Sequence, residues 1–172
     1  MVAVYFLFLM AAELVSTEAM TGSVTVREYR AHADRGHTAY RAKKWDKAFD
    51  HLSQAARWGH TRSQFLLGML ILEGHAREGE SHWGYAWLLV SNHSKNPNWK
   101  AEVDKLTAAA PDAWRETGQA LAKRLDDLYG ADAYGIECKQ SKGTGTHLRY
   151  QTCSRPNRKN RPTFPTYESM PL

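Results

Sequence analysis

The sequence predicts an all-α fold, a short α-solenoid of antiparallel helical hairpins, with a small β-hairpin in its C-terminal part. Apolar and small residues recur at helical spacing over 46–57 and 61–73, which favours two amphipathic helices. A similar pattern returns further along the chain, as expected of stacked repeats. A Gly-rich turn between two Cys-bearing segments then indicates a pair of short strands.

The clearest helical hairpin is expected over 46–72. A Gly just past a helix can take the left-handed conformation that closes the helix, so Gly59 is expected to end the first of the two helices. Ala56 and Gly68 carry almost no side chain, which lets two helix backbones approach closely. We therefore expect Ala56 and Gly68 to lie at a close helix crossing.

The pattern recurs at one constant offset. Ala48 and Gly84 are 36 positions apart, and so are Leu52 and Leu88. A period in the mid-thirties is typical of helical solenoids. Upstream, 29–43 has the character of an earlier repeat helix followed by a tight turn. Two hairpins are thus predicted, with a third helical layer downstream.

These residues carry a resemblance to a known family. Positions 48–68 have the pattern A-x-x-x-x-x-x-A-A-x-x-G-H-x-x-x-Q-x-x-L-G, and 84–88 have the sequence GYAWL. Over about 29–93 the chain resembles the Sel-1-like repeat, a relative of the tetratricopeptide repeat. The resemblance implies stacked helix pairs and a scaffold that binds a protein partner. Ile71 and Gly84 depart from the family pattern, as do Ser91 and Asn92, so the second repeat is expected to pack against something other than a full third repeat.

In chain order, helices are expected over 27–43, 46–57, 61–73, 81–93, 101–107 and 112–129. A short linker over 22–26 precedes them, with Ser23 as the expected N-cap. Pro97 is expected to break the helical stretch before it. Pro111 and Asp112 suit the start of the last helix and Gly130 its end. This last helix would cover the open end of the solenoid.

Residues 1–19 are predicted to be a signal peptide. An apolar run over 2–12 is too short to span a membrane, and small residues precede a cleavage site after Ala19. The mature chain would then be periplasmic or secreted and would have no transmembrane span. Since no Lys or Arg precedes the apolar run, the alternative is a cytoplasmic protein with a misassigned start codon.

The remaining chain divides into a helical domain over 20–130, a hairpin segment over 131–155 and a disordered basic tail over 156–172. The chain has two Cys, Cys138 and Cys153, which flank the Gly-rich turn on the expected strands. Export would favour a disulfide between them, because an isolated hairpin is marginal in water. The alternative is two reduced thiols in the cytosol. The segment is similar to a tail of some short bacterial secreted Sel-1-like proteins.

The net charge of +5 is concentrated near the C-terminal end. From 138 to 172 one residue is acidic, Glu168, and seven are basic. This basic patch consists of Lys139, Lys142, Arg149, Arg155, Arg158, Lys159 and Arg161. Such a patch suits an anionic polymer or surface, although a solvated basic tail has the same composition.

No catalytic residue, cofactor or metal is predicted. The chain lacks a G-x-S-x-G elbow, a P-loop, a dinucleotide fingerprint and H-E-x-x-H. His32 with His37, or His75 with His82, could be considered as metal ligands. Their spacing is not i, i+4 and no carboxylate or Cys joins them, so solvated or capping His is favoured.

The predicted function is that of a non-enzymatic protein–protein interaction scaffold of the cell envelope, with an unidentified protein partner. Arg30, Arg62 and Gln64 are the candidate contact residues, because they interrupt otherwise apolar or small helical faces. The alternative is an anion-binding protein that uses the basic C-terminal segment for nucleic acid, lipopolysaccharide or acidic cell-wall polymer. An enzyme with an unrecognised site is the third possibility. Salt dependence separates the first two, since phosphate contacts weaken steeply with salt.

Overall fold

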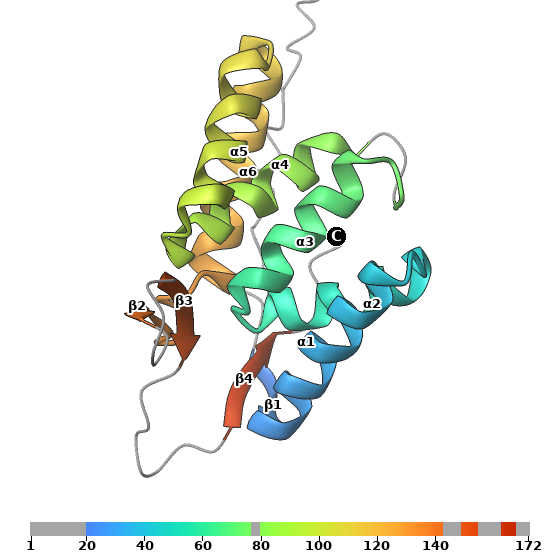
Figure 1. Cartoon of the computed structure of the whole chain (residues 1–172), viewed down its shortest axis with the longest axis vertical. Coiled ribbons are helices and arrows are strands. Elements are labelled where there is room, and N and C mark those ends of the chain that lie inside the picture. The colour runs from blue at the N-terminus through green and yellow to red at the C-terminus, as the bar shows by residue number, and fades with distance from the viewer. Residues whose placement is uncertain (1–19, 77–79, 143–148, 155–162, 168–172) are drawn as a thin grey trace, which may run out of the picture.

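The structure is a computed structural model that describes residues 20–76, 80–142, 149–154 and 163–167 (Figure 1). The described residues form six α-helices, one short 3₁₀ helix and four strands. In chain order these are β1 (Met20–Thr25), α1 (Val26–Arg41), α2 (Trp45–Arg57), α3 (Thr61–Leu72), α4 (Ser81–Ser91), η1 (Asn92–Ser94), α5 (Pro97–Ala109), α6 (Asp112–Tyr129), β2 (Glu137–Lys142), β3 (Arg149–Ser154) and β4 (Thr163–Tyr167). The prediction of a mostly helical chain is confirmed.

Helix α1 begins with a capping box at Thr25. The Thr25 hydroxyl accepts the Glu28 N–H at 3.2 Å, and the Glu28 carboxylate accepts the Thr25 N–H at 2.8 Å. The expected cap, Ser23, was therefore wrong: it lies in β1, opposite Pro165 of β4. The reason is that Glu28 stands three residues after Thr25, where it can complete the box.

Helices α1, α2 and α3 all end in the same way. After α2, Gly59 takes a left-handed conformation with φ of 78°, and the N–H of His60 donates back to the last helical turn. Gly74 and Lys43 adopt the same conformation after α3 and α1, with φ of 73° and 55°. The predicted role of Gly59 is confirmed, and the endings at Lys43 and Gly59 turn the chain into the next helix within a few residues.

Glycines allow the helices of each hairpin to approach closely. Helix α1 packs on α2, and α3 packs on α4. A Cβ atom at Gly68 would lie 2.7 Å from the carbonyl oxygen of Gly84 on α4. Gly68 is thus at a close crossing, but its partner there is Gly84 and not Ala56. On α1, a Cβ atom at Gly36 would similarly lie 2.8 Å from the side chain of Leu52.

The third layer consists of α5 and α6. Pro97 starts α5 instead of only ending what precedes it, because Asn96 caps the helix and Pro is well tolerated at the first helical position. The expected range 101–107 was therefore too short at its start. Helix α6 spans 112–129 as predicted, and it packs against α4.

The main core lies between α2, α3, α4 and α6. Its largest buried side chains include Leu52, Leu67, Leu70, Trp87 and Leu125. A second, smaller apolar cluster consists of Trp58, Ala131, Tyr134 and Ile136. Tyr29, Cys138 and Cys153 pack against this second cluster, so the segment after α6 returns to the first two helices.

The predicted hairpin is present as β2 and β3, which pair antiparallel with Cys138 opposite Cys153. The two Cys form a disulfide, as predicted for an exported chain. The turn between the strands lies outside the described residues.

Strand β4 pairs antiparallel with β1, beside the start of α1 (Figure 1). The expectations of a linker over 22–26 and of disorder throughout 156–172 were therefore wrong for 22–25 and 163–167. Thr163, Phe164 and Tyr167 favour strands, and Pro165 is tolerated in a strand with one neighbour. The remainder of 156–172 and the predicted signal peptide lie outside the described residues. None of the described helices combines the length and apolarity needed to cross a membrane.

Candidate functional site

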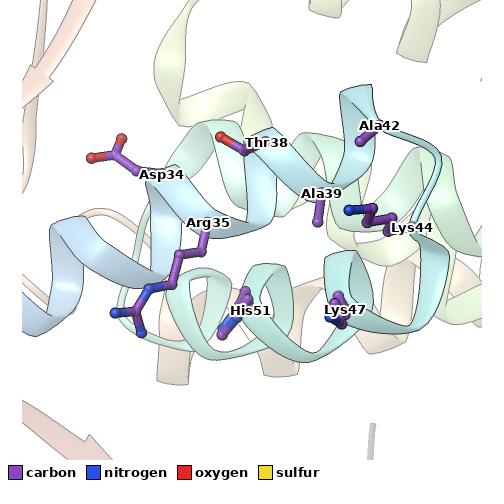
Figure 2. A pocket seen from close by; sticks show the side chains of 8 residues that line it. All are labelled: Asp34, Arg35, Thr38, Ala39, Ala42, Lys44, Lys47 and His51. Carbon is purple, nitrogen blue, oxygen red and sulfur yellow. The ribbon is translucent and has the colours of Figure 1, made fainter.

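An open groove of about 360 Å³ runs between α1 and α2 (Figure 2). Residues of both helices and of the turn between them form its walls. They are Asp34, Arg35, Thr38, Ala39, Ala42, Lys44, Lys47 and His51. The groove exists because Ala39 and Ala42 leave little side-chain volume where larger residues would fill the space.

The sequence places these residues on one surface through helical spacing. Arg35, Ala39 and Ala42 share a face of α1 at intervals of four and three residues, and Lys44, Lys47 and His51 recur at similar intervals from the start of α2. The tight turn at Lys43 then brings the two faces together.

The groove is basic at its rim. Arg35, Lys44 and Lys47 line it with one carboxylate, Asp34. Figure 2 shows Asp34 pointing away from Arg35. Within the described ranges, no ion pair involves any of the three cations. The groove therefore carries net positive charge, with three cations against one carboxylate.

Four histidines pair beside this groove, between α1, α2 and the start of α3. His51, at one end of the groove, has its Nδ1 3.4 Å from Nδ1 of His32. His60 caps α3 by accepting the Ser63 N–H at 3.1 Å. The Ser63 hydroxyl lies 2.9 Å from Nδ1 of His60 and 3.4 Å from Nε2 of His37, so it bridges the second pair.

The environment disfavours protonation of three of these histidines, His32, His37 and His60. Burial, and then the positive charge of Arg62, lower the pKa of His37 to about 4. Burial lowers the pKa of His60 to about 3, and His37 adds to this effect. The pKa of His32 is lowered by burial and then by His51. Neutral imidazoles can both donate and accept hydrogen bonds, which these pairs require.

The predicted contact residues have different environments. Arg30 on α1 and Arg62 on α3 are exposed, so both are available to a partner. Gln64 is fully buried, and its Nε2 donates to the carbonyl oxygens of Ala56 at 3.1 Å and Tyr129 at 2.7 Å. The prediction for Gln64 is corrected on this ground. A polar residue on an apolar face served here to satisfy carbonyls near two helix ends.

The basic patch is only partly described. Lys139 is exposed and forms an ion pair with Glu137 at 3.0 Å. Lys142 and Arg149 stand opposite each other in the register of β2 and β3. The other basic residues of the patch, Arg155, Arg158, Lys159 and Arg161, lie outside the described residues. In the part of the chain that the structure describes, no three His, Cys, Asp or Glu side chains gather as metal ligands would.

The chain was compared with protein-family models, curated proteins and solved structures. None of them matches it.

Two parts of this site were not predicted from the sequence. The basic groove had a signal, because Arg35, Lys44 and Lys47 flank a tight turn at helical spacing. The histidine pairs had none, since His32 and His51 are 19 positions apart and belong to different helices. Their pairing depends on how α1 crosses α2, which sequence spacing does not specify.

Proposed function

We propose that the chain is a non-enzymatic protein-interaction scaffold of the cell envelope, built as a short solenoid from two Sel-1-like repeats. The supporting observation is a contact that recurs in both hairpins. Gly36 of α1 lies against Leu52 of α2, and Gly68 of α3 lies against Leu88 of α4, each with 2.8 Å from the ideal Cβ position to the Leu side chain. Leu52 and Leu88 are the residues related by the 36-residue offset.

The packing of the layers supports the same proposal. Helix α2 packs on α3, and α6 packs on α4 where a third repeat would begin. The ring of Tyr85 on α4 occupies the space beside Gly118 of α6, so α6 covers the second hairpin closely. Stacked hairpins with a covered end leave the exposed side chains of α1, and Arg62 of α3, available to a partner.

Affinity capture tests this function. The full chain, purified from the cells that make it, is used as bait beside an Arg30→Ala/Arg62→Ala variant. Lys105→Ala/Lys123→Ala, which removes two exposed cations from α5 and α6, is the matched control. We expect the intact chain and the control to retain the same protein, and the Arg30/Arg62 variant to retain less. Absence of any retained protein with the intact chain would overturn the proposal.

A second candidate function is anion binding by the C-terminal segment. The observation that favours it is the register of β2 and β3, which places Lys142 opposite Arg149 within a segment, 138–172, that has seven basic residues and one acidic residue. Deletion of 156–172 and a salt titration test it. Binding that weakens steeply with salt and disappears with the deletion supports the anion binder, whereas binding that survives both supports the scaffold.

A further inference from the structure

We infer that the groove between α1 and α2 binds an acidic segment of the partner protein. In this arrangement Asp or Glu side chains of the segment meet Arg35, Lys44 and Lys47, and a small apolar side chain covers Ala39 and Ala42. The inference rests on the proposed scaffold function and names the surface and the chemistry of the partner.

Positive charge at the groove favours an acidic ligand. Its three cations have no ion-pair partner among the described residues, and Arg41 and Lys43 add two exposed cations beside the turn. The three cations outnumber the one lining carboxylate, Asp34, so an acidic ligand would complement the net positive charge of the groove. Complementary charge also accelerates encounter and excludes basic partners.

The lining of the groove favours a peptide over a nucleic acid as the acidic ligand. Two of the lining residues are apolar, the buried Ala39 and the exposed Ala42, and no Phe, Tyr or Trp lines the groove. Single-stranded nucleic acid binds through aromatic platforms on which bases stack, and this groove has only the His51 ring. A peptide can place carboxylates at the rim and a methyl or short aliphatic group against Ala39 and Ala42. The acidic protein segment is the better fit.

Contacts at both ends of the groove hold its backbone in place. The N–H of Lys44 donates to the carbonyl oxygen of Ala39 at 2.9 Å, which closes the turn at one end. At the other end, His51 is held against His32. A groove fixed at both ends loses little conformational entropy when a ligand enters.

Fluorescence anisotropy tests the inference with a short labelled peptide of alternating Glu and Ala. The same peptide with Gln in place of every Glu is the charge control. We expect the full chain to bind the Glu peptide, and Arg35→Gln/Lys44→Gln/Lys47→Gln to bind it about tenfold more weakly. Arg27→Gln/Lys105→Gln/Lys123→Gln removes three exposed cations elsewhere and should bind within about twofold of the intact chain. Lys47→Glu alone provides a second variant if the triple variant fails to fold.

Three results would overturn the inference. The two triple variants could lose affinity equally, the Gln peptide could bind as well as the Glu peptide, or single-stranded DNA could bind the groove as tightly as the Glu peptide. The scaffold proposal fails differently. If the intact chain captures no protein, the scaffold is wrong. If the groove variant captures the partner as well as the intact chain does, only the groove assignment is wrong.

Discussion

At the scale of single residues, four histidines have the most consequential environments in the described chain. His32 meets His51, and His37 meets His60 through Ser63. Each pair joins residues of two different helical elements through contacts between ring nitrogens or through a hydroxyl. Protonating both members of a pair would place two positive charges in contact and remove the acceptor nitrogens.

Acidification should therefore destabilise the fold. The pKa values of His37 and His60 in the folded chain, about 4 and about 3, lie below the ordinary value of 6.5. As pH falls, the unfolded chain binds these protons first, so stability is full above about pH 6.5 and is lost as pH falls toward 4. Solvent screens the partly exposed His37, so we expect the free energy of unfolding to be about 2–3 kcal/mol lower at pH 5 than at pH 7.

Urea denaturation across this pH range measures the effect. His37→Gln/His60→Asn should flatten the pH dependence, and Asn at position 60 still offers an oxygen to cap α3. His82→Gln lies outside the two pairs and serves as the control. An unchanged pH dependence in the double variant would show that other groups are responsible.

At the scale of helices and strands, the sequence predicted the helix ends that single Gly or Asp residues determine. The ends of α6 followed from Asp112 and Gly130, and the end of α2 from Gly59. The break before Pro97 was predicted correctly, but its position at the start of α5 was missed, because the sequence alone does not reveal whether such a Pro also begins the next helix. Strand β4 was missed for a different reason: its partner, β1, lies at the opposite end of the described chain, and a short segment interrupted by a Pro becomes a strand only when it is paired.

The crossing of α3 and α4 gives the second prediction. A side chain at Gly68 would collide with the Gly84 carbonyl, which belongs to the backbone and yields only if the helices move apart. Gly68→Leu should therefore lower the free energy of unfolding by about 1–3 kcal/mol or more. Ala120→Leu, on an exposed position of α6, should change it by less than about 0.5 kcal/mol. Equal thermal stability of the two variants would contradict a close crossing of α3 and α4 at Gly68.

At the scale of the whole molecule, the segment after α6 joins the last helix to the first two. Tyr134 and Ile136 pack on Trp58 at the end of α2, and the disulfide of Cys138 and Cys153 packs against the same cluster. The disulfide thus stabilises both the β2–β3 hairpin and its attachment to the helical layers.

Cys138→Ser/Cys153→Ser is the third prediction. The two Cys are 15 positions apart, and closing such a loop contributes about 3 kcal/mol in the chain-entropy model. We expect a loss of up to that size, together with weaker near-ultraviolet circular dichroism from Trp58 and Tyr134 and an unchanged helical signal. The intact chain under reducing conditions should behave in the same way. Unaltered stability in both experiments would contradict the prediction.

The disulfide also reports on the compartment. Mass spectrometry of the chain purified from cells under alkylating conditions should find a mass deficit of two hydrogens and no alkylation, if the chain is exported. Two alkylated thiols would instead favour the cytoplasmic alternative.

The pairing of β1 with β4 has a mechanical consequence. Met20 faces Tyr167 at one end of this ribbon, and Thr25 faces Thr163 at the other. Tension applied through the flanking chain at Met20 and Tyr167 would act on neighbouring positions and open the ribbon pair by pair, in the manner of a zipper, because the hydrogen bonds lie along the pull. Only after the last pair had separated would the load reach α1. The ribbon would therefore yield at low force and lengthen the chain while the helices stayed folded.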